Sequence, residues 1–491
     1  MNTLKEILSL PPRKLLGLAI SNPGLRKVAL DSVKKIIYKN LIATSERHTK
    51  PIREAQYQAI VNMLLAIDRA FAEDLISKSV KDRLLKIFIG KIVMRDEKVI
   101  KNFCAKYNSG PPGFLVISPV KQCNLKCAGC YAASVISSNE QLDYKIVDRI
   151  ISEKTKLWDS YFTVISGGEP FLWNFNGKTI LDLFSKHNDN YFLMYTNGTL
   201  INKAVAERMA EIGNVTPAIS VEGFEEQTDK IRGKGIFKKI LQAMENLRAA
   251  GVPFGISVTA TKENAELLMS DEFIDFFFNK RKALYGWLFQ YMPIGRALTL
   301  DRMVTPEQRK WMLEREQNII FEKQLPYFDF WNGGLYASGC IAGARSGGYF
   351  YIEWNGNITP CVFFPYSIGN IKEIYNRGGN LNDVINSPLF KKIREFRSNY
   401  GYNKIGSVIG NWFAPCPIRD HYDFAYRAIK ETKAYPIDET ANVAINDPLY
   451  YQGLVSYGKI YQELTAEKWR NLFLENNNIW KNKFKERRKN V

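Results

Sequence analysis

Short runs of β-branched and aromatic residues alternate with longer amphipathic stretches through the middle of the chain. Six such runs occur between residues 114 and 291, and the segments between them carry apolar residues at helical spacing. The runs are Phe114–Ser118, Tyr161–Ser166, Tyr191–Thr196, Pro217–Val221, Phe254–Thr259 and Gly286–Tyr291. Six strands, each followed by a crossover, predict an α/β fold with a parallel sheet wound into an open or closed barrel, and ligands at the carboxyl ends of the strands.

The regions on either side follow other patterns. Before the first strand the chain reads as helical, with Leu30, Val33 and Ile37 at helical spacing after a helix start at Ser21-Asn22-Pro23. We expect these helices to pack against the main domain rather than to lie on a membrane. We predict four parts. They are an N-terminal basic helical region (1–110), the strand–helix barrel (111–330), a Gly-, aromatic- and Cys-containing region (331–425) and a charged helical tail (426–491).

Composition and charge narrow the class of protein. The 491 residues are 46% hydrophobic and 24% charged, which is typical of a folded chain with a large core. The net charge is +18, and the excess is concentrated at the ends: residues 1–50 hold ten Lys or Arg against three acids, and residues 467–491 hold eight against three. Basic ends indicate an anionic partner, such as phospholipid or nucleic acid, or only a well-solvated surface.

Neither a run of 18 apolar residues nor a signal-peptide pattern occurs in the sequence. We therefore expect a cytoplasmic protein. The basic ends suggest an alternative location, bound peripherally to the inner face of the membrane. The seven cysteines are few and odd in number, and three of them fall within eight positions. This usage argues against structural disulfides and for metal binding.

The first predicted strand leads directly into a loop that carries Cys123, Cys127 and Cys130. The C-x3-C-x2-C spacing lets a short loop wrap one corner of a four-iron, four-sulfur (4Fe-4S) cluster, so that each sulfur reaches a different iron and the fourth iron has no protein ligand. Structural zinc takes four ligands, and catalytic zinc commonly includes His, which is absent near this loop. An iron–sulfur site is therefore favoured over zinc or an inert group of thiols.

Further motifs follow at the ends of the next strands. In chain order they are Ser166-Gly167-Gly168-Glu169-Pro170, Thr196-Asn197-Gly198-Thr199, Ser220-Val221-Glu222-Gly223, Asp229-Lys230-Ile231-Arg232-Gly233 and Pro293-Ile294-Gly295-Arg296-Ala297. Together with the cysteine loop they resemble the radical S-adenosylmethionine (radical SAM) family over residues 114 to about 300. Five ordered elements at consecutive strand ends are far more specific than any one of them.

The resemblance implies a partial (β/α)6 barrel and an oxidoreductase that cleaves S-adenosylmethionine (SAM) reductively. The product, a 5′-deoxyadenosyl radical, would abstract hydrogen from an unactivated C–H bond, and an electron donor such as ferredoxin or flavodoxin would reduce the cluster. Cys123, Cys127 and Cys130 would be both the metal ligands and the catalytic site.

The resemblance also assigns SAM-binding residues. Gly167 and Gly168 would let backbone carbonyls approach the methionine ammonium and Glu169 would add negative charge, while Arg232 would pair with the methionine carboxylate. Asn197, Ser220 and Glu222 complete the predicted cofactor-binding set, the last two near the ribose and the ammonium. Relatives commonly place an aromatic residue just before the third cysteine to contact adenine, but here that position is Gly129 and the aromatic residue follows, at Tyr131.

A second set of cysteines lies downstream at Cys340, Cys361 and Cys416. The strong turn signal Asn355-Gly356 predicts a β-hairpin between the first two. This arrangement resembles the SPASM or twitch extension of radical SAM enzymes and implies one auxiliary iron–sulfur cluster, a 4Fe-4S cluster, with an incomplete cysteine set. The fourth ligand could be Asp420, His421, Cys104, water or substrate, and three unrelated core thiols are the alternative. Cys104 itself is expected to be a small buried apolar residue.

Several functions fit these residues. The leading hypothesis is a radical SAM enzyme acting on a membrane-associated lipid, because the ends are basic and amphipathic and a segment rich in phenylalanine (Phe273, Phe276, Phe277, Phe278) could line an apolar tunnel. The alternative is a maturase of a ribosomally made peptide, which would predict a winged-helix module that the helical N-terminal region lacks. A nucleic-acid substrate is not expected, because aromatic and basic residues are not interleaved at the ends. A non-enzymatic iron–sulfur or zinc interaction protein would explain the thiols but not the ordered SAM motifs.

Overall fold

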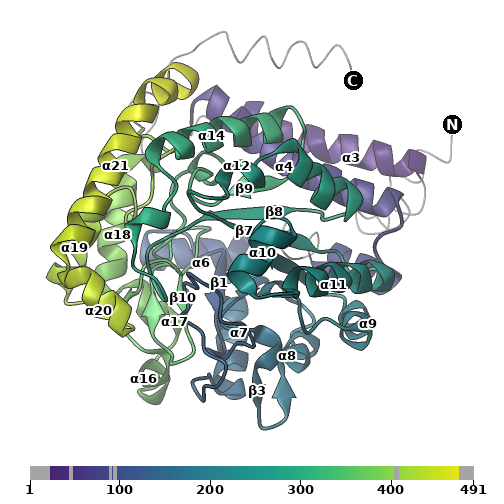
Figure 1. The fold of residues 1–491 in the computed structure, drawn as a ribbon, viewed down its shortest axis with the longest axis horizontal. Helices are drawn as coiled ribbons and strands as arrows, with labels where there is room; N and C mark the ends of the chain where they lie inside the picture. Colours follow the sequence, from purple (N-terminus) through teal and green to yellow (C-terminus); the bar gives the residue numbers. More distant parts are fainter. Residues whose placement is uncertain (1–22, 44–47, 88–90, 92–96, 403–408, 475–491) are drawn as a thin grey trace.

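A computed structural model describes residues 23–43, 48–87, 91, 97–402 and 409–474. Its centre is a sheet of nine strands in the order β11-β10-β1-β2-β5-β6-β7-β8-β9, drawn in Figure 1. The six predicted strands are confirmed and pair in parallel from β1 to β8. They are β1 (Phe114–Ile117), β2 (Phe162–Ile165), β5 (Tyr191–Thr196), β6 (Val215–Val221), β7 (Gly255–Ala260) and β8 (Gly286–Gln290).

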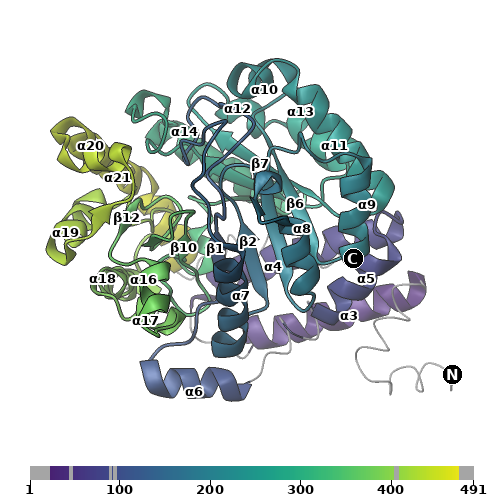
Figure 2. The same ribbon diagram turned by 90° about the horizontal axis from the view of Figure 1, so that it is seen from below.

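Helices between these strands cover one face of the sheet, which Figure 2 shows edge-on. The helix α7 (Tyr144–Trp158) begins because the Asp143 side chain accepts the Lys145 N–H, and it turns Val147, Ile150 and Ile151 into the core. The other covering helices are α8 (Ile180–Lys186), α9 (Lys203–Ile212), α10 (Glu225–Arg232) and α11 (Ile236–Ala250). Together the strands and helices form the expected α/β partial barrel.

The sheet extends beyond the six predicted strands at both edges. The strand β9 (Tyr327–Asp329) adds in parallel to β8, and β10 (Tyr351–Ile352) adds in parallel to β1. A turn at Asn355-Gly356 joins β10 to β11 (Ile358–Thr359) in the predicted antiparallel hairpin, with φ of +92° at Gly356. The third part of the chain therefore shares a sheet with the barrel, which the loss of alternation after residue 330 does not reveal.

Between residues 23 and 107, the described segments form helices without strands. These are α3 (Pro23–Tyr38), α4 (Lys50–Ala72), α5 (Lys78–Leu84) and α6 (Glu97–Tyr107). The expectation that they pack against the main domain is confirmed for α4, whose buried Ile52 and Ala55 share an apolar cluster with Leu313 and Trp412. Much of the basic excess of the chain, at 1–22 and 475–491, lies outside the described residues.

The remaining helices and strands are of two kinds. Those that follow β8 in the sequence lie mainly on the flank of the sheet beside β10, on the left of Figure 2, and end with the long helix α21. The others, β3, β4, α12 and α13, lie between barrel strands in the sequence. The bounds of both kinds are α12 (Ala265–Leu268), α13 (Asp271–Ile274), α14 (Pro306–Phe321), α15 (Gly334–Ala337), α16 (Ile371–Asn376), α17 (Leu381–Ile385), α18 (Pro388–Arg397), α19 (Tyr422–Thr432), α20 (Glu439–Asn446), α21 (Pro448–Trp469), and the short strands β3 (Asn174–Phe175), β4 (Lys178–Thr179), β12 (Tyr366–Ser367) and β13 (Tyr435–Pro436). Across the described ranges, we find no helix with the length and apolar character that a bilayer crossing requires.

The phenylalanine-rich segment has a structural role. Phe273 and Phe277 are fully buried, and Phe276 packs edge-on against Phe224 with ring centroids 5.5 Å apart. None of the four phenylalanines lines either of the two cavities described below. The segment therefore completes the packing around α10 and α11, and the tunnel that the sequence suggested is not formed by these residues.

Candidate functional site

A cavity of about 390 Å³ opens at the carboxyl ends of the barrel strands, as the sheet topology predicts. It brings together residues that are far apart in the sequence, from Phe114 on β1 to Phe363 after β11. The predicted residues that line it are Cys123, Cys127, Cys130, Gly167, Gly168, Asn197, Ser220, Glu222 and Arg232. Glu169 is the one predicted cofactor residue that does not line it.

The cysteine loop is held by backbone hydrogen bonds to the loop after β2. The Gly168 N–H donates to the Val120 carbonyl at 2.8 Å, and the Glu169 N–H donates to the Gln122 carbonyl at 2.8 Å. A β-carbon at Gly168 would clash with that same Gln122 carbonyl oxygen. Glycine is therefore required at 168 because the two loops approach closely, a reason different from the approach to SAM that the resemblance suggested.

The three thiols line one cavity. In the described part of the chain no group of three or more His, Cys, Asp or Glu is arranged to hold a single metal ion. The C-x3-C-x2-C spacing of the thiols fits a 4Fe-4S cluster, in which each cysteine binds a different iron. Burial raises the pKa of Cys123 to about 11 and also raises the pKa of Cys127. Metal binding would therefore release protons from these thiols.

Glu222 and Arg232 form a buried ion pair on the wall of this cavity. The Arg232 Nη2 atom lies 2.5 Å from Glu222 Oε1, and Glu222 Oε2 accepts the Thr259 N–H at 3.3 Å. The Arg232 Nε atom is buried and has no hydrogen-bond partner. A guanidinium has five N–H donors and Arg232 lines the cavity, so the arginine fits the role that the resemblance implies while it also neutralises Glu222.

Glu169 is turned away from the cavity. Its carboxylate accepts hydrogen bonds from Thr196 Oγ1 at 2.7 Å and from the Asn197 N–H at 2.8 Å, and burial raises its pKa to about 7. These contacts tie the loop after β2 to the end of β5. Asn197 in turn lies on Cys123, with its Nδ2 atom 3.7 Å from the sulfur. The predicted contact of Glu169 with the methionine ammonium stays a prediction, whereas its support of Asn197 is visible.

Arg302 is a cavity residue that no sequence motif indicated. Its guanidinium lies 5.1 Å from the centre of the Tyr291 ring. A β-carbon at Gly129, where φ is +82°, would lie 2.8 Å from Arg302 Nη1 and 3.2 Å from the Tyr291 ring. The space next to the third cysteine is therefore taken by an arginine and a tyrosine from the loops after β8. Tyr131 also lines the cavity, and its hydroxyl group forms a hydrogen bond with Ser166 Oγ at 2.6 Å.

A second cavity, of about 540 Å³, is lined by Cys340, Cys361 and Cys416. The Tyr349 hydroxyl lies 2.9 Å from the Cys361 sulfur. The two cavities share a wall, because four residues line both of them. These residues are Trp287, Phe330, Ile341 and Tyr349. The second cysteine set is thus placed directly behind the first cavity.

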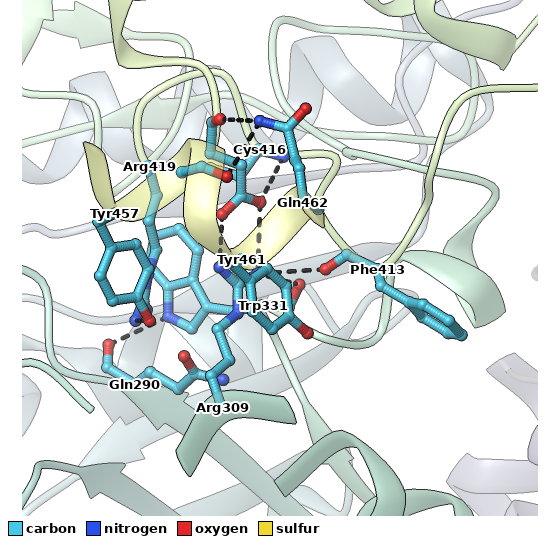
Figure 3. Close-up of polar contacts among 12 residues, drawn as sticks. Gln290, Arg309, Trp331, Phe413, Cys416, Arg419, Tyr457, Tyr461 and Gln462 are labelled. Atoms are coloured by element: carbon cyan, nitrogen blue, oxygen red, sulfur yellow. Dashed lines mark hydrogen bonds and ion pairs between the residues drawn. The ribbon is translucent and has the colours of Figure 1, made fainter. Parts of the chain in front are cut away.

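The candidate fourth ligands named from the sequence lie outside this lining. Asp420 pairs with Arg309 at 2.5 Å and accepts the Cys416 N–H at 3.0 Å, as Figure 3 shows for the network around Arg309. His421 Nε2 lies 3.0 Å from the Ala414 carbonyl oxygen, and its ring sits between those of Phe396 and Tyr400. Cys104 lies on α6, is partly exposed rather than buried as the sequence suggested, and lines neither cavity. The identity of the fourth ligand stays a prediction with the alternatives given above.

Comparison with known proteins identifies two family domains in the chain. Residues 117–273 match the radical SAM superfamily, and residues 340–405 match the SPASM iron–sulfur cluster-binding domain. The first match contains Cys123, Cys127 and Cys130, and the second contains Cys340 and Cys361 but ends before Cys416.

Three curated relatives are similar over part of their length. The Fe-coproporphyrin III synthase of Methanosarcina barkeri is 29% identical over 35% of this chain and 42% of its own. The mycofactocin maturase MftC of Mycolicibacterium smegmatis is 28% identical over 56% of this chain and 71% of its own. The antilisterial bacteriocin subtilosin biosynthesis protein AlbA of Bacillus subtilis is 27% identical over 55% of this chain and 59% of its own. The match thus spans less than half of the first of these relatives.

Proposed function

The chain is a radical SAM protein with a SPASM iron–sulfur domain, and we propose on that premise that it is a maturase, which modifies a ribosomally made peptide. The observation that carries the proposal is the convergence of three thiols, an ion-paired arginine and the predicted SAM-binding loops on one cavity. The names of two relatives, a maturase and a bacteriocin biosynthesis protein, support a peptide substrate over the lipid that the sequence suggested.

The structure offers little for a lipid or a tetrapyrrole. The phenylalanines that suggested a lipid tunnel are packed in the core, and the relatives give no support to a lipid substrate. The Fe-coproporphyrin III synthase raises a tetrapyrrole as a second candidate. Its carboxylates would need cationic partners, but the only arginines or lysines among the described residues lining the cavity are Arg232 and Arg302, both near the cysteines. A peptide is therefore the better candidate.

The chain's own residues would bind and orient the cofactor. Arg232 would offer its guanidinium to the methionine carboxylate, and Arg302 would lie beside the nucleoside. Ser220 and Asn197 would add polar contacts, while the backbone bonds of Gly168 and Glu169 keep the cysteine loop in place. When bound, a 4Fe-4S cluster on the three cysteines supplies the electron that cleaves SAM to the 5′-deoxyadenosyl radical, which takes hydrogen from a C–H bond.

The test begins with anaerobic reconstitution of the full chain with iron and sulfide. We expect about eight irons per chain for two clusters, and 5′-deoxyadenosine on addition of SAM and dithionite. Peptides translated from short reading frames beside the gene are then added, and mass spectrometry follows each peptide. A mass change that requires SAM supports the proposal. The proposal would be refuted if none of the peptides is modified and phosphatidylglycerol in vesicles or coproporphyrin is modified instead.

Three cysteine variants give the matched controls. Cys123→Ala should abolish 5′-deoxyadenosine formation. Cys361→Ala should lower the iron content toward half while SAM is still cleaved, because Cys361 lines only the second cavity. Cys104→Ala should change neither quantity, because Cys104 lines neither cavity. Loss of SAM cleavage in Cys104→Ala would mean that the sites are assigned wrongly.

A further inference from the structure

The first cavity changes in character along its depth. Its mouth, at the carboxyl ends of the strands, is polar and carries Glu222, Arg232 and Gln290. Toward the amino ends of β1, β2 and β5 the lining is apolar, with Phe114, Val116, Phe162, Val164 and Leu193. Tyr195, Trp287 and Phe289 add aromatic rings, and Ser257, which is paired with Trp287 in the strand register, adds a hydroxyl group.

Strand register explains this gradient. Side chains of a strand alternate between its faces, so residues two apart point the same way. On β1 and β2 the inward pairs are Phe114 with Phe162 and then Val116 with Val164, directly opposite each other in the parallel register. The Phe114 and Phe162 rings are 5.8 Å apart. The next inward position on β2 is Ser166. Toward the mouth, the inward side chains of β2 are therefore first aromatic, then aliphatic and then polar.

The SPASM part of the chain closes the apolar end. Phe363 packs against Phe289 at 5.7 Å and against Phe330 at 5.6 Å between ring centroids, and Ile341 and Val362 line the cavity beside it. The hydroxyl of Tyr349 is engaged with the Cys361 sulfur, so this tyrosine offers the cavity its ring rather than a polar atom. The wall shared by the two cavities is therefore apolar as well.

Formal charge is confined to the mouth. Among the described residues that line the cavity, the charged side chains other than thiols are Glu222, Arg232 and Arg302. The first two are paired with each other, and Arg302 lies beside Gly129 in the cysteine loop. A carboxylate or ammonium group pushed into the deep end would lose its hydration and find no partner of opposite charge. An uncharged apolar group would instead gain by leaving water.

We infer that the group that gives up hydrogen is a large uncharged side chain, aromatic or branched aliphatic. This inference rests on the proposed function and adds the class of residue that is modified. A cavity of about 390 Å³ is near the lower end of ligand-sized pockets, and the cofactor at the cysteine loop would take part of this volume, which favours a single side chain as the group that enters.

Deuterated side-chain analogues test the inference without knowledge of the peptide. The probes are perdeuterated toluene and 2-methylbutane on the apolar side, and perdeuterated propionate and n-butylamine on the charged side. One electron from dithionite cleaves SAM to methionine and the radical. The radical breaks a C–D bond of the probe and forms a C–D bond in 5′-deoxyadenosine, and excess dithionite with a solvent proton quenches the probe radical. Comparing 2-methylbutane with n-butylamine controls for C–H bond strength.

We expect at least tenfold more deuterium in 5′-deoxyadenosine from the apolar probes than from the charged ones. Saturation-transfer NMR on the reconstituted protein with SAM and no reductant should show the same order of binding. The inference is overturned if the charged probes transfer as much deuterium as the apolar probes, or more. It is also overturned if 5′-deoxyadenosine carries no deuterium from either apolar probe. If 5′-deoxyadenosine does not form at all, the proposed function fails instead.

Substitutions at the deep end localise the effect. Val164→Phe fills the space between Val116 and Leu193, and it should remove transfer and NMR saturation from 2-methylbutane while SAM cleavage continues. Val443→Phe, on the exposed face of α20, is the surface control. If Val164→Phe does not fold, Phe289→Asp places a carboxylate in the cavity and should shift the preference toward n-butylamine; an unchanged preference overturns the inference.

Discussion

At the scale of single residues, Tyr349 connects the two cavities. Its hydroxyl lies 2.9 Å from the Cys361 sulfur, and its ring lines both cavities. Burial and the neighbouring sulfur raise the pKa of Tyr349 well above its usual range, so the hydroxyl stays protonated and is the donor when the sulfur is a thiolate. Hydrogen bonds to ligand sulfurs stabilise the reduced, more negative cluster and raise its potential.

Tyr349→Phe should therefore lower the midpoint potential of the auxiliary cluster, by an amount on the order of tens of millivolts. A redox titration followed by electron paramagnetic resonance measures it on the reconstituted protein. Tyr285→Phe is the matched control, because the Tyr285 hydroxyl is also buried but bonds to Thr216. A potential that moves equally in both variants would show a general effect of packing rather than the hydrogen bond.

The position of Arg302 in the first cavity leads to a prediction about SAM binding. Within the described chain its guanidinium donates no hydrogen bond and rests on the Tyr291 ring, so its donors are available to a ligand. Arg302→Ala should weaken SAM binding by roughly ten- to a hundredfold, the size of a lost hydrogen bond from a charged group. Calorimetry without reductant measures the dissociation constant.

The control for this prediction is Arg427→Ala, an exposed arginine on α19 that pairs with Asp423. Its dissociation constant for SAM should equal that of the wild type. Unchanged SAM affinity in Arg302→Ala would mean that the guanidinium only fills the space beside Gly129. A partial rescue by Arg302→Lys would assign the effect to the positive charge.

At the scale of elements, the β10–β11 hairpin is closed by a buried acid. The two oxygens of Glu353 accept the Asn355 N–H at 2.9 Å and the Asn357 N–H at 3.0 Å. Burial raises its pKa to about 7, from 4.5. The folded protein thus binds a proton that the unfolded chain releases between about pH 4.5 and 7, and the contribution of Glu353 to stability falls as pH rises through this window.

Glu353→Gln removes this titration. The free energy of unfolding of the wild type, relative to the variant, should fall by about 3 kcal/mol from pH 4.5 to above pH 7 and then remain level. Urea unfolding at a series of pH values measures it. Glu245→Gln, with its side chain half exposed on α11, should track the wild type at every pH. A difference between wild type and Glu353→Gln that does not depend on pH would contradict the assignment.

At the scale of the whole molecule, a buried ion pair joins three parts of the chain. Arg309 on α14 and Asp420 after the Cys416 loop are both fully buried and lie 2.5 Å apart. Tyr461 of α21 stacks on the same guanidinium at 3.7 Å, and Gln462 donates to the Asp420 carbonyl at 2.8 Å (Figure 3). The Arg309–Asp420 pair therefore connects α14, the segment that carries Cys416, and α21.

Asp420→Asn should lower the free energy of unfolding by about 3–5 kcal/mol, because it leaves the Arg309 charge buried without its partner. It should also lower the iron content toward four per chain, since the Asp420 carboxylate anchors the Cys416 N–H. Urea unfolding and iron analysis measure the two effects. Asp423→Asn breaks an exposed pair on α19 and should cost no more than about 1 kcal/mol with full iron content. Full iron content in a destabilised Asp420→Asn would separate the ion pair from the cluster site.

The sequence determined the parts of the fold that depend on local order. The six strands, the helices between them and the Asn355-Gly356 hairpin follow from periodicity and turn signals, which involve residues near one another in the chain. The cysteine loop and the strand-end motifs identified the first cavity for the same reason, since parallel strands bring their carboxyl ends to one edge. The four predicted domain ranges stay predictions.

Pairing between distant side chains was decided only in three dimensions. Glu169 could be found by its motif, but its contact with Thr196 and Asn197 depends on how β2 and β5 lie side by side. Arg302 fills the space at Gly129 through a loop 173 positions later, and no spacing rule connects the two. The shared apolar wall is of the same kind, because it needs β10 to pair with β1. Local patterns specify elements, whereas burial and charge compensation depend on distances that only the folded chain defines.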